Sequence, residues 1–305
     1  MGSDQGADIR KRRKGWVIYN GFLSWEKNRE PALQLCESAS RLGEDLTAVR
    51  NCDVRYTLDG NGVTLIGDRP DYVIFWDKDI RLAKALESAG IRVFNSSDAI
   101  EACDDKSLTG IILAKHGIRT PKTIIAPKTY ASCGFCDKTF IHEAVSILGL
   151  PVVVKECRGS FGFQVHLFDT EDEICAFADG CGDTPFLLQE FIRSSSGRDI
   201  RINMVGHTAV ASMYRHSANG DFRANVTNGG LMEYHHPNDR EVDIAVSCMD
   251  ALGLDFAGID ILFGEDGPIV CEVNSNAHMK NILMCTGINV ADHIIRYVVS
   301  VIDNE

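Results

Sequence analysis

Hydrophobic positions in the first third of the chain form short apolar runs that alternate with amphipathic stretches. Three runs have the length and the β-branched and aromatic content of buried strands, at residues 15–20, 72–76 and 91–95. Two stretches, 30–42 and 80–89, carry apolar residues at helical spacing, and each is followed by a glycine. Because strands that alternate with helices usually form a parallel sheet, this third predicts an α/β domain.

The rest of the chain predicts more strands than helices. The expected helices are 104–115, 141–148, 171–178 and 289–302, and the expected strands are 151–155, 164–168, 186–192, 199–205, 208–215, 257–263 and 268–274. The last two strands flank the turn-like sequence Gly264-Glu265-Asp266-Gly267, which predicts an antiparallel hairpin. We expect an α/β (α+β) architecture in four parts: a flexible basic terminus (1–14), an α/β domain (15–97) and two further units (98–185 and 186–305).

The expected hairpin carries three oxygen-bearing side chains, Asp260, Glu272 and Asn274, at the ends of apolar runs. Residues two apart in a strand share a face, so Glu272 and Asn274 point the same way and Asp260 can lie opposite them. Burying a charge is costly unless it is paired or bound to a metal. Hard carboxylate and amide oxygens suit Mg²⁺, and a solvated acidic face of the hairpin is the alternative.

Composition narrows the class of protein. The chain has 305 residues, of which 45% are hydrophobic and 24% charged, as in ordinary folded domains. Its apolar runs are far shorter than the roughly 20 residues needed to cross a membrane, so we expect no membrane partner. A basic cluster spans residues 10–14, but the net charge of −12 argues against nucleic acid as a partner. We therefore expect this terminus to be flexible and solvated.

The eleven cysteines point to reduced thiols and a cytoplasmic location, since no secretion signal precedes them. Cys133 and Cys136 form a lone CxxC motif, with His142 as its single nearby candidate ligand. A zinc site needs more ligands than this, so a metal or redox role for the motif is weakly indicated.

Candidate phosphate-binding groups lie downstream of residue 98. Lys155 closes an apolar strand and precedes a loop with Gly159 and Gly162, which can lay backbone N–H groups over phosphates. The loop lacks the Walker A pattern, and a tight hairpin with a solvated lysine is the alternative. Lys106 begins a helix, where the helix dipole disfavours a cation, although the neighbouring Asp104 and Asp105 can explain it locally.

Arginines could stabilise charge in a phosphoryl transfer. Arg215 ends an apolar strand, and Arg223 and Asn225 would share a face of an extended segment. An ordinary surface arginine is the alternative for each.

In order and spacing, these segments resemble the ATP-grasp superfamily, and most closely its RimK-like carboxylate–amine ligases. The matching stretches are 105–123, 151–155 with its glycine loop, 189–192, 197–201, 222–225 with 229–230, 257–260 and 272–274. The resemblance covers about residues 98 to 302, and the first third fits the domain that usually precedes an ATP-grasp fold.

The resemblance implies roles for individual residues. Lys106 and Lys155 would contact ATP phosphates under a mobile flap that runs from Gly159 through Ser160 to Gly162. Other implied nucleotide contacts are Gln189, Glu190, Phe191, Ile192, Asp199 and Arg201, with Asp199 on the ribose. Asp260, Glu272 and Asn274 would hold two Mg²⁺ ions, with Mn²⁺ as the alternative ion. Arg215, Arg223 and Asn225 would steady the γ-phosphate and the acyl phosphate.

The family reaction activates a carboxylate with ATP and lets an amine attack the acyl phosphate. The segment from Ser275 to Asn281 departs from the family pattern. RimK-like ligases usually have Pro-Gly and then an acidic residue after the metal-binding asparagine. This chain has Ala277-His278 in place of Pro-Gly and Lys280 in place of the acidic residue. His278 and Lys280 would suit an anionic substrate. An ATP-grasp kinase and a non-catalytic nucleotide-binding module are the alternatives, and homo-oligomerisation is left open.

Overall fold

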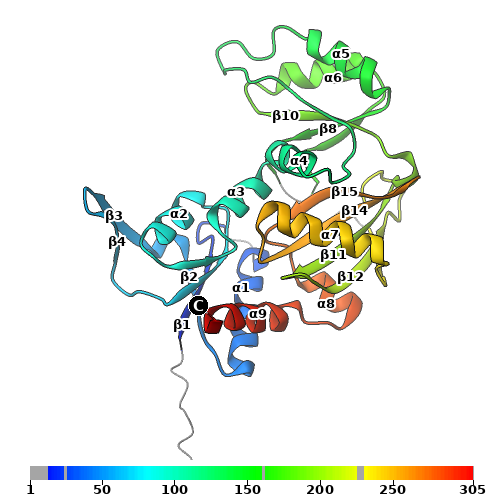
Figure 1. Cartoon of the computed structure of the whole chain (residues 1–305). Helices are drawn as coiled ribbons and strands as arrows, with labels where there is room; N and C mark the ends of the chain where they lie inside the picture. Colours follow the sequence, from blue (N-terminus) through cyan, green and yellow to red (C-terminus); the bar gives the residue numbers. More distant parts are fainter. Residues whose placement is uncertain (1–12, 24–25, 160–161, 225–229, 305) are drawn as a thin grey trace, which may run out of the picture. The chain divides into compact units, whose positions relative to one another are not determined.

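The computed structural model describes residues 13–23, 26–159, 162–224 and 230–304 (Figure 1). Contacts between residues divide the chain into two compact units. Unit 1 comprises residues 1–97 with 294–305, and unit 2 comprises residues 98–293. Most of the basic terminus lies outside the described residues, and Lys14 already belongs to the first strand.

Unit 1 is built on a four-stranded parallel sheet in the order β2-β1-β5-β6. Its strands are β1 (Lys14–Tyr19), β2 (Asp45–Arg50), β5 (Tyr72–Trp76) and β6 (Arg92–Phe94). Every residue of β5 is buried, as expected for a central strand of a parallel sheet that is covered on both faces. Helices α1 (Glu26–Leu42) and α2 (Ile80–Ser88) follow β1 and β5. The α/β expectation for the first third is confirmed.

The sequence patterns missed β2 and the hairpin formed by β3 (Arg55–Asp59) and β4 (Gly62–Ile66). Both hairpin strands are largely exposed, and Leu58 and Ile66 face solvent, so the apolar alternation marks no buried face. A usable signal existed in the turn sequence Asp59-Gly60-Asn61-Gly62, because Asp-Gly and Asn-Gly pairs favour tight hairpin turns.

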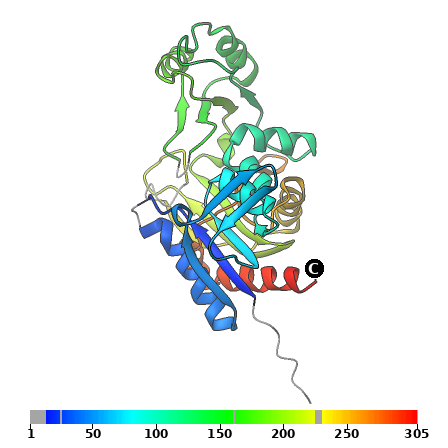
Figure 2. The same cartoon turned by 90° about the vertical axis from the view of Figure 1, so that its left-hand side faces the viewer.

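The first sheet of unit 2 is antiparallel in the order β7-β10-β8-β9. It comprises β7 (Thr123–Ile125), β10 (Phe186–Glu190), β8 (Val152–Glu156) and β9 (Val165–Phe168). Helices α5 (Thr139–Leu148) and α6 (Glu171–Gly180) lie side by side against this sheet in both views (Figures 1 and 2). Aromatic rings fill the layer between them, with the Phe135 and Phe186 ring centroids 4.9 Å apart.

The second sheet of unit 2 is antiparallel in the order β13-β12-β11-β14-β15. It comprises β13 (Leu231–Tyr234), β12 (Thr208–His216), β11 (Arg198–Val205), β14 (Phe256–Gly264) and β15 (Gly267–Asn274). Helices α3 (Ser97–Asp104), α4 (Lys106–Lys115) and α7 (Asp239–Leu252) share one apolar core with it. The hairpin expected at residues 257–274 is therefore confirmed as β14 and β15.

Helix α7 was missed, although its sequence carries clear boundary signals. Asn238 and Glu241 form a capping box at its start, and Gly253 follows its end with a φ of 63°. Cys248, Met249 and Leu252 are buried at helical spacing. The chain ends with α8 (Lys280–Thr286) and α9 (Val290–Asn304), of which α8 was not expected.

No single helix in the described ranges combines the length and apolar character needed to cross a bilayer. Helices α8 and α9 meet the length and composition criteria for a membrane span only when they are taken together, and the chain bends by 114° at the break between them.

Candidate nucleotide and metal site

The hairpin of β14 and β15 places the two acidic side chains directly opposite each other. Asp260 pairs with Glu272 and Gly258 pairs with Asn274. The register shifts between Asp260 and Ile261, which is a β-bulge that leaves Cys271 as the extra residue on β15. Because of this bulge, Val270 and Val273 both remain in the core although they are three residues apart.

One pocket in unit 2 gathers most of the site residues selected from the sequence. Its lining includes Lys106, Lys155, Gly159, Gly162, Gln189, Glu190, Phe191, Ile192, Asp199, Arg223, Asp260 and Glu272. The described lining of this pocket does not include five other selected residues, which are Arg201, Arg215, Asn274, His278 and Lys280. Ser160 and Asn225 lie outside the described residues.

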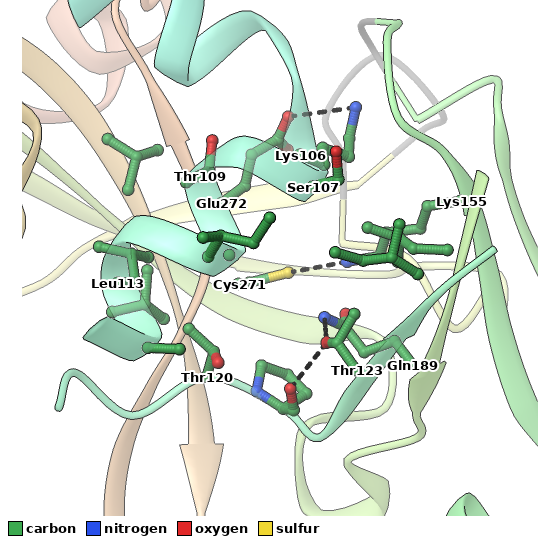
Figure 3. A pocket seen from close by; sticks show the side chains of 18 of the residues that line it. Lys106, Ser107, Thr109, Leu113, Thr120, Thr123, Lys155, Gln189, Cys271 and Glu272 are labelled. Carbon is green, nitrogen blue, oxygen red and sulfur yellow. Dashed lines mark hydrogen bonds and ion pairs between the residues drawn. The ribbon is translucent and has the colours of Figure 1, made fainter. Parts of the chain in front are cut away.

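Two lysines approach the acidic hairpin from different elements. Lys106 Nζ lies 3.9 Å from Glu272 Oε1 and donates a hydrogen bond of 3.2 Å to the carbonyl of Gly159. Lys155 Nζ donates to Cys271 Sγ at 3.7 Å, and its side chain is buried, with 7% relative exposure (Figure 3). An ammonium group carries three donors, so this weak bond to sulfur leaves capacity for anionic oxygens.

The buried position of Lys155 leads to a testable expectation. The variant Lys155→Met should unfold at the same or a higher temperature than the wild type, because it removes a charge that burial penalises. Its affinity for ATP should fall about ten- to hundredfold, since a hydrogen bond to a charged group is lost. Thermal unfolding with and without ATP and Mg²⁺ measures both effects. The exposed Lys115→Met in α4 is the control, and equal ATP stabilisation of all three proteins would contradict this role.

Behind the pocket, charged side chains of three adjacent strands form a buried network. Arg215 donates two hydrogen bonds of 2.6 Å to Asp199 and lies 3.0 Å from Asp260. Arg201 donates two more of 2.6 Å to Asp260. Strand register explains the pairs, because Asp199 faces Arg215 and Arg201 faces Asp260 across neighbouring strands.

The two carboxyl groups of this network differ in pKa. Burial would raise the pKa of Asp260, but Arg201 and Arg215 outweigh it and hold that pKa below its usual value. Burial, together with the nearby charge of Asp260, raises the pKa of Asp199 despite its contact with Arg215. Arg201 and Arg215 thus bind protein carboxylates here, and their expected roles on nucleotide and γ-phosphate remain predictions.

Arg223, in the segment after β12, contacts the end of the glycine loop and the start of β9. It donates to the carbonyls of Gly162 at 2.8 Å and Val165 at 3.4 Å, at the end of the glycine loop. Asp221 holds the same guanidinium through two side-chain hydrogen bonds of 3.0 and 2.8 Å, and this contact lowers the pKa of Asp221. The arginine is therefore positioned where the loop returns to β9.

The other end of the loop requires glycine. Gly159 has a φ of 142°, and a Cβ at this position would lie 2.5 Å from Oε1 of Gln164. The N–H of Lys106 donates to the carbonyl of Cys157 at 2.8 Å, which ties the start of α4 to the start of the loop.

The segment at Glu190 is braced by the linker before β7. The N–H of Lys122 donates to Glu190 Oε1 at 2.6 Å, and the N–H of Glu190 donates to the carbonyl of Lys122 at 2.9 Å. The carboxylate of Glu190 therefore supports the linker, which is compatible with the expected use of backbone groups in this segment.

Several lining residues were not selected from the sequence. They are Val153, Gln164, Val165, Ser195, Arg198, Phe222, Ala224, Leu262 and Cys271. Among them, Cys271 lies beside Lys155, and burial raises the pKa of its thiol. The unusual spacing of Val270 and Val273 is the sequence signal of the bulge that exposes it to the pocket.

A second pocket, drawn in Figure 3, shares part of its lining with the first. Helix α4, the linker at Thr120–Thr123, β10 and β15 form its walls. Both pockets share Lys106, Lys155, Gln189, Cys271 and Glu272.

The side-chain oxygens at the hairpin fit a divalent cation that also takes ligands from a bound anion. Within the described ranges, no three His, Cys, Asp or Glu side chains converge into a complete metal cluster. Asn274 Nδ2, however, is buried without a hydrogen-bond partner among the described residues. Rotating that amide by 180° would exchange its nitrogen and oxygen, so that the oxygen would take the position of Nδ2 near the Asp260–Glu272 pair. Such a site takes part of its coordination from phosphate, as Mg²⁺ usually does.

The CxxC motif is not among the described residues that line either pocket. Cys133 and Cys136 are exposed, and His142 lies 3.3 Å from Glu171 instead. All eleven cysteines are free thiols. A metal or redox role of the motif thus gains no support from the described residues.

Comparisons with known proteins agree with this geometry. The sequence model of the RimK-like ATP-grasp domain matches residues 103–298. Ribosomal protein bS6–L-glutamate ligase of Escherichia fergusonii is 34% identical over 70% of this chain and 70% of its own length. Human N-acetylaspartylglutamate synthase A is 32% identical over 75% of this chain and 57% of its own length.

The fold agrees as well. The crystal structure of a RimK domain ATP-grasp protein from Sphaerobacter thermophilus superimposes with a TM-score of 0.69, over 93% of this chain and 98% of that chain, at 20% identity. ATP-grasp proteins bind ATP with a divalent metal. With the family model covering most of unit 2 and curated relatives above 30% identity, this chain belongs to the RimK-like ATP-grasp family.

Proposed function

We propose that this ATP-dependent carboxylate–amine ligase uses the pocket at the acidic hairpin to make an acyl phosphate and transfers the acyl group to an amine. The observation that carries the proposal is the convergence of Lys106, Lys155 and Arg223 on Asp260 and Glu272 in one pocket. A phosphorylated carboxylate is a good electrophile, and the amine displaces its phosphate. No enzyme nucleophile is needed, so the free cysteines have no required covalent role.

The lining suggests how ATP would lie in the pocket. Val153, Phe191, Ile192 and Leu262 supply apolar surface for a base. The cations Lys106, Lys155 and Arg223 supply charge for the phosphates. Asp199, whose carboxylate is held by Arg215, is the acidic group we assign to a ribose hydroxyl. This separation of apolar and charged lining supports a binding mode in which the base lies near the segment 189–192 and the phosphates face the hairpin.

Glu272 and Asn274, with Asp260 behind them, would hold the divalent metal. When bound, it supplies positive charge to the phosphate oxygens, as Mg²⁺ or Mn²⁺ does in phosphoryl transfer. Lys106 links Glu272 to the glycine loop, and Arg223 fixes the far end of that loop. Together they would close the loop over the phosphates and keep water from the acyl phosphate.

The substrate is proposed to be anionic, because of the segment that follows Asn274. Ala277 is buried against Gly258, where an added Cβ would lie 2.5 Å from the Ala277 Cβ. The neighbouring His278 is half-buried and Lys280 is exposed at the start of α8. An amino acid such as glutamate, joined to a small molecule or a peptide, fits the ammonium group of Lys280 and the imidazole of His278. We place the reaction in the cytoplasm, where the free thiols remain reduced.

Phosphate release over panels of acids and amines tests the ligase reaction. Free phosphate and ADP should appear only when an acid and an amine are both present, and mass spectrometry should show an amide product. A phosphorylated product without phosphate release would instead establish the kinase alternative. ATP binding without turnover on any substrate pair would favour the non-catalytic module.

A further inference from the structure

Beside the apolar surface proposed for a base, side chains on three strands form a row, of which Val153 and Gln189 line the nucleotide pocket. Thr123 on β7 is in register with Gln189 on β10, which is in register with Val153 on β8. Gln189 Nε2 donates to Thr123 Oγ1 at 2.8 Å, and Thr123 Oγ1 donates to the carbonyl of Pro121 at 2.8 Å (Figure 3). Gln189 is 8% exposed, so its amide is held inside the protein.

This chain of hydrogen bonds fixes which way the amide of Gln189 points. A hydroxyl has one proton, and a backbone carbonyl can only accept. The proton of Thr123 is used on Pro121, so Thr123 must accept its second hydrogen bond, and only the nitrogen of the Gln189 amide can donate it. The amide orientation therefore follows from the chemistry of its partners, although oxygen and nitrogen have nearly the same shape.

The oxygen of Gln189 lies on the other branch of the amide, away from Thr123. Gln189 lines the nucleotide pocket beside Val153, Phe191 and Ile192, the surface that a base would contact. A fixed acceptor at this place favours a ligand that presents a donor. Adenine carries an exocyclic amino group, whereas guanine carries a carbonyl oxygen at the same ring position.

We propose that Thr123 is a positioning residue for nucleotide specificity: by accepting from Gln189 while donating to Pro121, it locks the amide oxygen toward the pocket and so selects ATP over GTP. Thr123 acts through Gln189 and does not touch the nucleotide itself. The inference rests on the proposed function, because it requires a base beside Gln189.

Nucleotide binding measured by calorimetry, with ATP and GTP each in the presence of Mg²⁺, tests this role. The wild type should bind ATP more tightly than GTP. Thr123→Val has nearly the same shape but no hydroxyl, so the amide of Gln189 can rotate, and the preference for ATP should fall about three- to tenfold, the value of one hydrogen bond. Thr123→Ser keeps the hydroxyl and should keep the preference.

A double variant shows whether Thr123 acts through the amide. Gln189→Leu should lose the preference by itself, and adding Thr123→Val should change it no further. In turnover assays the KM for ATP should rise in Thr123→Val while kcat at saturating ATP stays near the wild-type value. Should Thr123→Val fold poorly in thermal unfolding, Thr123→Ala in the same assays replaces it.

The outcomes separate the two proposals. A wild type that binds neither nucleotide would overturn the proposed function. A wild type that prefers ATP, with an unchanged preference in the variant without the hydroxyl, would overturn the role of Thr123 and leave the ligase proposal intact.

Discussion

Replacing Glu272 with alanine should lower turnover about 1000-fold or more while leaving the fold unchanged. This carboxylate lies opposite Asp260 and 3.9 Å from Lys106, where it would hold the metal and align a phosphate ligand. Loss of a group that stabilises charge during transfer costs about 4 kcal/mol, which corresponds to roughly a thousandfold in rate. Steady-state phosphate release with saturating ATP and Mg²⁺ measures it.

The same hairpin offers a matched control. Glu265 is an exposed glutamate in the turn between β14 and β15, and Glu265→Ala should keep wild-type turnover. Because the side chain of Glu272 is 35% exposed, its removal leaves no large cavity, and the unfolding temperature should be close to that of the wild type. Turnover within tenfold of the wild type, with the same Mg²⁺ requirement, would refute the metal assignment.

Replacing Arg215 with alanine should lower the free energy of unfolding by about 3–5 kcal/mol, the usual cost of leaving buried charges unpaired. Arg215 is 4% exposed and contacts two buried carboxylates, Asp199 and Asp260. Urea unfolding followed by circular dichroism measures the change. The exposed Arg240→Ala in α7 is the control and should change stability by less than about 0.5 kcal/mol.

The pH dependence of the Arg215→Ala variant should distinguish an unpaired charge from lost packing. Burial raises the pKa of Asp199 and the charge of Arg215 lowers it, so removing Arg215 should raise this pKa further in the folded variant. When the pKa of a carboxyl group is higher in the folded than in the unfolded state, its ionisation destabilises the fold at pH values above the folded-state pKa. This destabilisation disappears as the pH falls toward the pKa of the unfolded chain, about 3.9, because the group becomes protonated. The stability gap between wild type and variant should therefore narrow as the pH falls from 7. A constant gap would indicate lost packing alone.

Local sequence patterns were sufficient for several elements that are both buried and regular. The strands at Tyr72–Trp76 and Val152–Glu156 and the hairpin ending at Asn274 carry apolar runs that have few alternative structures. The β3–β4 hairpin lacked this signal because solvent-exposed faces impose no hydrophobic period. Helix α8, with 7 residues, is too short to show a helical period. Helix α7 had caps that could have identified it.

The charge network at the site could not be read from single segments. Asp199, Arg201, Arg215 and Asp260 lie on β11, β12 and β14, and only the register of these strands decides which cation meets which carboxylate. In the sequence, each of these residues appeared as a separate candidate ligand of nucleotide, phosphate or metal.

By itself, the sequence determined the kind of chemistry: acidic and amide groups on a hairpin, two lysines and a glycine loop, in the order found in ATP-grasp ligases. Residue types and their spacing carry that information because chemistry needs particular groups on particular faces. The tertiary structure alone decided that Arg215 is shared by two carboxylates, that Cys271 lies beside Lys155, and that Thr123 orients Gln189. These features depend on the pairing of strands distant in sequence, where one residue of register changes every contact.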